Sequence, residues 1–580
     1  MVKKLAKSIR QYKKQTVLAP VFVTLEVAME CILPLYMVYM LEKIQADNSI
    51  GNILTYGGIL LALSFLALLF GVLSGKFAAT ASAGFARNLR QDLYYAVQDF
   101  SFANIDKFST SGLVTRMATD VSNVQMAFMM LVRVAFRSPV MLVFSLVMAF
   151  ALNATLAWIF LALVPVLGGI LVFVVFKVNP IFDKVFKKYD AMNESVQENI
   201  KGIRVVKSYV REDYEKKKFE RTAEDVRRDF TRAEKIVAIN TPAMQLCMWF
   251  AILMICFLGS LISVQSGGEL ISSATLSRLI VYAAQILSSL MMFSMVLVMV
   301  TIGRTSAERI VEVLDEKSSL TSPENAVTEV KDGGIVFENV SFRYSETAEK
   351  FALKNIDLVI RPGETVGILG STGSSKTTLV NLIPRLYDVS EGSVKVGGRD
   401  VREYDLESLR NAVSVVLQKN VLFSGTIKKN LRWGDADATD EEIVRACKLA
   451  QADEFIQGFP DKYDTYIEQG GTNVSGGQKQ RLCIARALLK KPKILILDDS
   501  TSAVDTKTDA LIRKAFREEI PDTTKIIIAQ RVSSVQDADK IILMENGEIG
   551  AMGTHEELMK SSPVYREIYE SQNKRGGEEE

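Results

Sequence analysis

Long apolar runs dominate the chain up to about residue 302. They cover approximately residues 16–41, 53–82, 128–152, 155–178, 242–265 and 276–302. Each run exceeds the ~20 residues that a helix needs to cross ~30 Å of hydrocarbon. The pattern therefore predicts six transmembrane helices within a domain that spans residues 1–310.

Lys and Arg are distributed unevenly among the connections between these runs. Residues 177–240 contain sixteen of them, the connection between the second and third runs contains four, and the other three connections contain only Lys43. Basic residues favour the cytoplasmic side of a membrane, and an even number of spans puts both chain ends on one side. We therefore predict a multi-pass membrane protein with both termini and everything after the last span in the cytoplasm.

The two long connections are predicted to be helical extensions below the membrane. Residues 177–240 mix charged with apolar positions, and after Pro180 no proline recurs until Pro242, so helices can continue there. At ~1.5 Å per residue, ~25 helical residues on each side of a bend would reach roughly 35 to 40 Å. We expect the bends near Ser109 to Asp120 and Gly202 to Arg211.

The pattern changes to that of a soluble domain after residue 310. Residues 311–334 include Pro323 and the pair Gly333-Gly334, which predict a helix end and a linker. From Ile335 to the end, short Val/Ile/Leu strands alternate with helical patterns, which predicts an α/β domain over residues 335–580.

One predicted strand of this domain ends at two carboxylates. Residues 494–497 are all large aliphatics, as a buried parallel strand requires. Asp498 and Asp499 follow at the carboxyl end, where chemistry in such sheets is located. The first aspartate suits a Mg²⁺ ion, and a second carboxylate suits an attacking water.

A second strand leads into a loop that suits phosphate. Residues 366–369 are followed by a loop and then by a helical pattern, so that backbone N–H groups can converge on an anion. Lys376 would reach the β- and γ-phosphates, and the Thr377 hydroxyl would ligate Mg²⁺. The loop itself consists of Gly370, Ser371, Thr372, Gly373, Ser374, Ser375, Lys376, Thr377 and Thr378. The sequence departs from GxxxxGK[ST] at Ser375, where glycine is usual.

Further motifs follow this loop in a fixed order. Gln418 lies in VVLQKNVLFSGTI, residues 474–481 read VSGGQKQR, and KILILDDSTSAVD comes next. This series resembles the nucleotide-binding domain of ABC transporters. With six spans ahead of it, the whole chain resembles a half-transporter of the ABC exporter superfamily, of the multidrug-resistance type. The resemblance implies a multi-domain fold, in which a six-helix transmembrane domain with long cytoplasmic extensions is fused to an α/β P-loop nucleotide-binding domain.

The resemblance also implies roles for single residues, with ATP and Mg²⁺ as cofactors. Tyr344 resembles the aromatic residue that stacks on adenine, although a strand tyrosine is more often a packing residue. Gln418 resembles the glutamine that touches Mg²⁺ and senses the membrane domain, and Asp498 resembles the second carboxylate that orders Mg²⁺. The signature residues, which in this family meet the γ-phosphate bound by the opposite subunit, are Ser475, Gly476, Gly477 and Gln478. Each ATP would thus lie between two chains, and STSAVD, which ends at Asp505, would suit contact across the dimer.

Two positions expected to act on the attacking water depart from the family's catalytic pattern. Asp499 stands where the family has glutamate, and Gln530 stands where an exporter usually has histidine. The shorter side chain displaces the carboxylate by roughly 1.5 Å, and a displacement of about 1 Å can cost a hundredfold in rate. A neutral glutamine cannot carry the charge of an imidazolium. The one histidine of the chain, His555, lies near the end and cannot substitute.

Together, Ser375, Asp499 and Gln530 resemble the degenerate half of a heterodimeric bacterial ABC exporter. The hypothesis is a chain of the bacterial inner (plasma) membrane that binds ATP, hydrolyses it poorly, and completes the catalytic site of a second half-transporter. Its cargo would be small amphipathic molecules, drug-like or lipid-like, exported by alternating access. The alternatives are a homodimer with two slow sites and an ATP-gated channel or regulator. An importer is disfavoured because the two domains are fused.

Composition narrows the partners further. A net charge of +2 argues against nucleic acid as the main partner, and the five cysteines lack CxxC spacing, which argues against a metal site or disulfides.

Glu26 and Glu30 lie on one face of the first span. They line the cargo pathway and favour cationic amphipaths, pair with a basic group such as Lys76 or Arg133 on a neighbouring helix, or lie near the lipid headgroups. The sixth span contains four methionines between residues 291 and 299, which suit either an adaptable binding wall or ordinary helix packing.

Overall fold

The structure is a computed structural model that describes residues 1–46, 50–265, 271–345, 348–500 and 503–576. Its internal contacts divide the chain into two units. Unit 1 comprises Met1–Asp99 and Phe108–Glu316, and unit 2 comprises Phe100–Lys107 and Lys317–Glu580. Each unit is described by itself.

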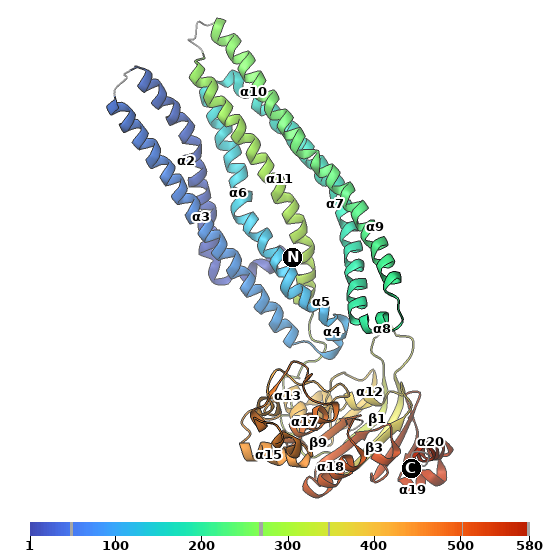
Figure 1. Ribbon diagram of the computed structural model, residues 1–580. Helices are drawn as coiled ribbons and strands as arrows, with labels where there is room; N and C mark the ends of the chain where they lie inside the picture. The colour runs from blue at the N-terminus through green and yellow to red at the C-terminus, as the bar shows by residue number, and fades with distance from the viewer. Residues whose placement is uncertain (47–49, 266–270, 346–347, 501–502, 577–580) are drawn as a thin grey trace. The chain divides into compact units, whose positions relative to one another are not determined.

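Unit 1 is helical (Figure 1). Among its described residues, six helices are long and apolar enough to cross a membrane, which agrees with the six predicted spans. Its helices are α1 Val2–Leu5, α2 Lys13–Ala46, α3 Ile50–Gln98, α5 Thr110–Thr115, α6 Val121–Leu152, α7 Ala154–Lys201, α8 Ile203–Ser208, α9 Glu212–Ala238, α10 Asn240–Gln265 and α11 Ser273–Asp315. Helices α3, α7 and α11 continue well beyond their apolar stretches, and the largely polar helix α9 precedes the apolar helix α10, as the predicted extensions require.

Cross-helix hydrogen bonds within the apolar region compensate for a proline in α2. Pro34 lacks an N–H, so the carbonyl of Glu30, four residues earlier, loses its helical donor. Gln285 of α11 donates to that carbonyl at 3.3 Å, and Tyr282 donates from its hydroxyl to the Cys31 carbonyl at 2.7 Å. Because hydrocarbon offers no water to satisfy a freed carbonyl, these bonds tie α2 to α11.

The two carboxylates of the first span pair with one arginine. Arg137 of α6 donates to both carboxylate oxygens of Glu30 at 2.8 Å and also bonds Glu26. Glu26 is only 8% exposed. The pairing alternative is therefore the one observed, but its basic partner is Arg137 rather than Lys76 or Arg133. Arg137 lies on the face of α6 that meets α2, one helical turn after Arg133.

The first cytoplasmic bend begins earlier than the sequence predicts. Helix α3 ends at Gln98 and α5 begins at Thr110, so the chain reverses before the expected stretch Ser109–Asp120. Ser109 is instead the N-cap of α5, since its hydroxyl accepts from the Gly112 N–H at 3.1 Å. A capping serine starts a helix and does not bend one. The prediction for the first bend is therefore wrong by about ten residues.

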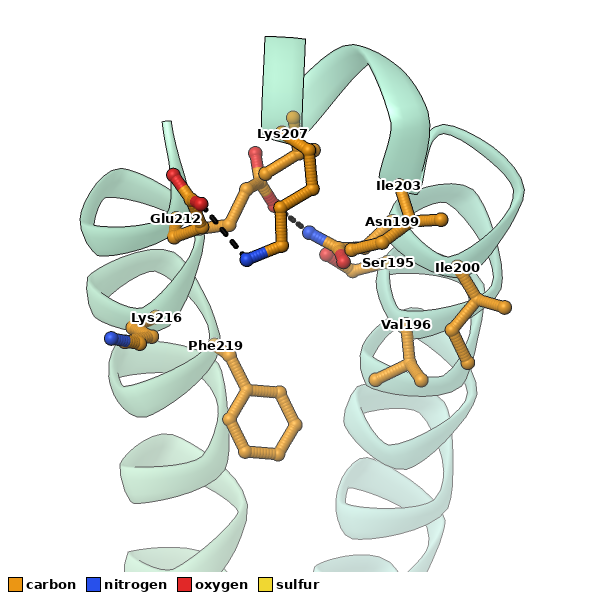
Figure 2. Close-up of a pocket in the computed structure, with 11 residues that line it drawn as sticks. Ser195, Val196, Asn199, Ile200, Ile203, Lys207, Glu212, Lys216 and Phe219 are labelled. Atoms are coloured by element: carbon orange, nitrogen blue, oxygen red, sulfur yellow. Dashed lines mark hydrogen bonds and ion pairs between the residues drawn. The ribbon is translucent and has the colours of Figure 1, made fainter. Parts of the chain in front are cut away.

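The second bend lies where the sequence predicts it, between Gly202 and Arg211. Helix α8 connects α7 to α9, and Val210 adopts a positive φ of 51° at the reversal. Figure 2 shows that Lys207 of α8 points toward Glu212 of α9, and the two form an ion pair of 2.9 Å. Asn199 of α7 likewise donates to Glu215 at 2.9 Å. These contacts lie in the lining of an open pocket of about 400 Å³ between α7 and α9.

Unit 2 is an α/β fold with two main sheets and a two-stranded ribbon. Its strands are β1 Ile335–Phe342, β2 Leu353–Ile360, β3 Thr365–Gly370, β4 Glu391–Val396, β5 Arg399–Asp400, β6 Val413–Val416, β7 Gly425–Thr426, β8 Tyr466–Ile467, β9 Ile494–Asp498, β10 Thr524–Ile528, β11 Lys540–Glu545 and β12 Glu548–Gly553. One sheet has the order β2-β1-β4-β5, the other β12-β11-β3-β10-β9-β6, and β7 pairs with β8. Within the six-stranded sheet β12 is antiparallel, and the other five strands run parallel.

Unit 2 also contains helices. They are α4 Phe102–Lys107, α12 Lys376–Asn381, α13 Leu406–Ala412, α14 Ile427–Leu431, α15 Asp440–Leu449, α16 Asp453–Gln457, α17 Gly476–Leu489, α18 Thr506–Glu519, α19 His555–Ser561 and α20 Pro563–Gly576. The short helix α4 belongs to this unit although it lies between α3 and α5 in the chain. Tyr387 donates to Asp106 of α4 at 2.7 Å, and Asn104 donates to the Lys317 carbonyl at 3.0 Å.

Candidate functional site

The predicted site residues gather at one edge of the six-stranded sheet. The strands β3, β10, β9 and β6 are neighbours and run parallel, so their carboxyl ends lie side by side. The phosphate loop follows β3, Gln530 follows β10, and Asp498 and Asp499 lie at the end of β9. Gln418 is exposed just after β6. The topology thus brings together four motifs that are scattered over 160 residues of sequence.

The Lys376 side chain folds back onto the phosphate loop and forms hydrogen bonds with it. Its ammonium donates to the carbonyls of Gly370 and Ser371 at 2.9 and 2.8 Å and to the Ser374 hydroxyl at 3.3 Å. Burial lowers the pKa of the Lys376 ammonium from its ordinary value, and the carboxylates of Asp498 and Asp499 oppose that shift. The Lys376 ammonium is positively charged, and the three loop groups that accept from it are neutral. The ammonium is therefore suited to bind a phosphate anion.

Ser375 has the backbone conformation for which glycine is the usual choice. Its φ of 70° and ψ of 24° lie in the left-handed region, and its side chain makes no capping hydrogen bond to α12. A residue with a Cβ pays roughly 1–2 kcal/mol for that conformation. The departure from the glycine pattern is therefore a local backbone strain at the phosphate loop.

Replacing Ser375 with glycine is expected to stabilise unit 2. Relief of the strain should exceed the entropy that glycine gains in the unfolded chain and leave a net gain of about 1 kcal/mol. Calorimetric unfolding of the full chain would measure it. Ser371→Gly is the matched control, because Ser371 is exposed and is not among the residues with positive φ. If Ser375→Gly raised the free energy of unfolding no more than Ser371→Gly does, the Ser375 backbone would not be strained.

Thr377 and Asp498 are poised as a pair of oxygen ligands. The Thr377 hydroxyl donates to Asp498 Oδ2 at 2.8 Å. Burial raises the pKa of the Asp498 carboxyl, while the Thr377 hydrogen bond lowers it. Hydroxyl and carboxylate oxygens are hard donors that suit Mg²⁺, and a bound cation would favour the ionised carboxylate. The donor set therefore fits the predicted ion, which supplies positive charge beside the phosphates when bound.

The two departures from the catalytic pattern contact each other. Gln530 donates from its amide Nε2 to Asp499 Oδ2 at 2.8 Å. Asp499 has a φ of 48°, and its backbone N–H donates to the Ile528 carbonyl at 3.0 Å, so it is fixed on the end of β10. The carboxylate of Asp499 is therefore held by a neutral amide, where the family would place glutamate beside histidine.

Tyr344 lies beside the phosphate loop. Its hydroxyl is 2.9 Å from the Thr378 hydroxyl, and its ring is half exposed. The ring stands edge-on to Phe342 and Tyr387, with centroids 4.9 and 5.2 Å away. Two aromatic neighbours fix the ring while one side remains accessible, as a base-stacking role requires.

The signature residues form the N-terminus of α17, a helix of fourteen residues. Ser475 caps this helix, and Gln478 completes a capping box with it at 3.0 and 3.3 Å. A Cβ on Gly477 would lie 2.8 Å from the Ala503 carbonyl, which explains the glycine. Ser475 and Gly476 are exposed, so the helix end is free to meet an anion carried by another chain.

Part of STSAVD, the segment expected to contact the partner, lies outside the described residues, namely Thr501 and Ser502. Of the described part, Asp505 caps α18 by accepting from the Thr508 N–H at 2.9 Å. The proposed contact across the dimer therefore stays a prediction.

Sequence reasoning missed two functional contacts. Arg137 interrupts an apolar run, and this signal could have identified it as the partner of Glu26 and Glu30. Gln572 of α20 bonds the backbone on both sides of Arg531, immediately after Gln530. No motif marks it, because a glutamine near the end of a polar helix is ordinary.

Comparisons with known proteins agree with this site. Residues 16–295 match the family model of the ABC transporter transmembrane region, and residues 353–502 match that of the ABC transporter. The chain is 36% identical over 571 residues to YfiB of Bacillus subtilis, an uncharacterized ABC transporter ATP-binding protein, with 98% of each chain covered. It is 33% identical over 495 residues to the ATP-dependent lipid A-core flippase of Desulfotalea psychrophila, with 84% of each chain covered.

A solved structure shares the fold. The structure of a bacterial Atm1-family ABC exporter with ATP bound matches with a TM-score of 0.84 at 23% identity and covers 97% of this chain and 98% of that one. The predicted fusion of six spans to an α/β nucleotide-binding domain is thereby confirmed. The chain belongs to the ABC transporter family, as an exporter half-transporter whose ATPase domain is coupled to transport and which requires a second half to form a dimer.

Proposed function

We propose that this chain is the degenerate-site subunit of a heterodimeric bacterial ABC exporter that moves amphipathic, drug-like or lipid-like molecules out of the cytoplasm. It lies in the plasma membrane with both termini and the nucleotide-binding domain in the cytoplasm. Its own phosphate loop binds ATP with Mg²⁺ and hydrolyses it poorly. Its signature at Ser475–Gln478 completes the catalytic site of the partner.

The hydrogen bond between Gln530 and Asp499 carries this proposal. A general base needs its carboxylate within reach of the attacking water. Here one carboxylate oxygen accepts from an amide at 2.8 Å, and the side chain is one methylene shorter than glutamate. A neutral amide also cannot stabilise the charge that develops on the γ-phosphate as an imidazolium would.

The remaining motifs support binding without turnover. Lys376, Thr377 and Asp498 have the geometry of a phosphate and Mg²⁺ site, and Tyr344 offers a ring face for adenine. In the cycle we propose, ATP closes the two nucleotide-binding domains on each other, the bend that precedes α5 and the bend at α8 transmit the closure to the helices, and hydrolysis at the partner's site resets the cycle. The site of this chain would keep its ATP and hold the dimer together.

Two observations support an amphipathic cargo. The similar protein of Desulfotalea psychrophila is named as a flippase of lipid A-core, which is an amphipathic lipid. The sixth span, within α11, exposes Met291, Met292 and Met295, each more than 40% exposed in the single chain. Adaptable methionine side chains suit varied apolar cargo.

The deciding experiment compares matched substitutions in the two halves. The full chain would be co-expressed with its candidate partner half-transporter, and ATPase turnover would be measured for Asp499→Asn and for the partner's catalytic glutamate changed to glutamine. We expect the partner substitution to abolish turnover and Asp499→Asn to leave most of it. Equal loss from both substitutions would refute the degenerate site. Slow turnover by the chain alone, with no partner present, that Asp499→Asn abolishes would favour a homodimer with two slow sites.

Transport itself needs a separate readout. Uphill accumulation of a fluorescent amphipathic dye in inverted vesicles is expected of an exporter. Single-channel conductance in a planar bilayer without accumulation would instead identify an ATP-gated channel.

A further inference from the structure

The C-terminal helix α20 is bonded to the backbone beside Gln530. Gln572 of this helix uses both ends of its side-chain amide. Its Nε2 donates to the Gln530 carbonyl at 2.9 Å, and its Oε1 accepts from the Val532 N–H at 2.8 Å. Donor and acceptor of one side chain thus bridge the switch segment, which we define as Gln530–Val532.

Helix α20 is firmly placed by the residues that precede Gln572. Tyr565 is fully buried, and its hydroxyl lies 2.7 Å from Nδ1 of His555 in α19. Ile568 and Tyr569 pack against the same apolar core as Val532 and Val535. Positions 565, 568, 569 and 572 share one helix face by their spacing of three and four. The face of α20 that packs on the core therefore also places Gln572 against the switch segment.

Gln530 connects Gln572 to the Asp499 carboxylate at the end of β9. Gln530, whose carbonyl accepts from Gln572, donates from its side chain to Asp499. The direction of the Gln530 side chain depends on its backbone, and that backbone is held on one side by β10 and on the other by Gln572. Two hydrogen bonds from one side chain fix position as well as distance.

We infer that Gln572 is a positioning residue for the switch segment, so that the C-terminal helix sets how firmly this chain's own site retains ATP. The inference rests on the proposed function in one respect, namely that Gln530 faces the γ-phosphate. With Gln572 in place, Gln530 is pre-organised for that contact. Without it, the switch segment has more conformations available, and bound ATP gains less from Gln530.

Amide hydrogen exchange tests the contact directly. In the full chain, the Val532 N–H should exchange faster in Gln572→Met, which keeps the length of the side chain but removes both polar atoms. Gln572→Glu should be intermediate, because one oxygen can still accept from Val532 while the other repels the Gln530 carbonyl. Ser571→Ala is the control, since the Ser571 hydroxyl bonds the Ile568 carbonyl of its own helix. Unchanged Val532 exchange in Gln572→Met would overturn the inference.

ATP release tests the functional consequence. With the chain in complex with its partner half, release of labelled ATP from this chain is expected to be on the order of fivefold faster in Gln572→Met. A general loss of folding could also speed release, so the decisive comparison is a double-mutant cycle. In a Gln530→Ala background, Gln572→Met should not change ATP release further, because the backbone contacts of Gln572 remain but the Gln530 side chain that they position is gone. An equal effect in both backgrounds would show that Gln572 only stabilises α20 and would overturn the positioning role.

These outcomes are separable from those of the proposed function. If Asp499→Asn abolished turnover, the degenerate site would be refuted, yet the Val532 exchange result would still report on Gln572. If release of ATP were insensitive to Gln572 while Asp499→Asn remained active, the proposed function would stand and the inference would fail.

Discussion

Restoring the family's catalytic pair by Asp499→Glu and Gln530→His is expected to raise ATP turnover at this chain's own site roughly a hundredfold. Glutamate carries the carboxylate one methylene further toward the attacking water. Histidine replaces an amide that now holds Asp499 Oδ2 at 2.8 Å and can become positively charged. The measurement is the ATPase rate of the complex in which the partner's catalytic glutamate has been changed to glutamine, so that only this site can turn over.

Three comparisons serve as controls for the gain in ATP turnover. Each single substitution should give a smaller gain, because the two side chains contact each other and act as a unit. Adding Lys376→Ala should abolish the gained activity, which assigns it to this phosphate loop. A parent chain that already hydrolyses ATP as fast as the double variant would contradict the degenerate site. Asp499 has a φ of 48°, which aspartate tolerates better than glutamate, so a small loss of stability is expected alongside.

Replacing Arg137 with leucine is expected to destabilise the membrane unit severely. Arg137 is the shared counter-charge of Glu26 and Glu30 in the apolar region, and its side chain is 20% exposed. Removing one partner of a buried ion pair costs roughly 3–5 kcal/mol, because the remaining charge is left unpaired. Thermal unfolding in detergent, read by loss of monodisperse protein, would measure the effect.

The matched variants test whether charge pairing is the cause. Glu26→Gln with Glu30→Gln should also destabilise the chain, because it leaves Arg137 alone. Adding both changes to Arg137→Leu should restore much of the stability, since no charge then remains. Arg133→Leu is the control on the same helix, since the described residues offer Arg133 no ion-pair partner. If the triple variant were no more stable than Arg137→Leu, packing rather than charge would explain the loss.

The same triple variant addresses the second interpretation of the two glutamates. If it folds and still transports cationic dyes, Glu26 and Glu30 serve the helix bundle and not the cargo. If it folds and loses only the cationic dyes, the carboxylates also contribute to cargo selection.

The elements that the sequence predicted well are those that local pattern encodes. The aliphatic stretch at 494–497 forms strand β9, fully buried as expected, with both aspartates at its carboxyl end. The six apolar runs lie in six long helices, and the motif after residue 366 forms a strand, a loop and a helix. In each case the period of apolar positions or the turn residues sufficed.

The sequence-based prediction placed the first bend about ten residues too late in the chain, and the reason is local. The stretch 109–120 contains Ser, Thr and Gly, which suggest a turn, yet Ser109 and Gly112 form an N-cap. A cap and a turn use the same residue types, and only the conformation of the next residues along the chain distinguishes them.

By itself the sequence determined the class of the protein, the ATP-binding motifs and the three departures at Ser375, Asp499 and Gln530. Only the tertiary structure decided how those departures act: Ser375 is left-handed, and Gln530 donates to Asp499. It alone identified Arg137 as the partner of Glu30, 107 residues away, and Gln572 as the partner of Gln530, 42 residues away. The physical reason is that periodicity and turn residues act between chain neighbours, whereas the pairing of distant polar groups depends on which side chains the packed helices and strands bring within about 3 Å.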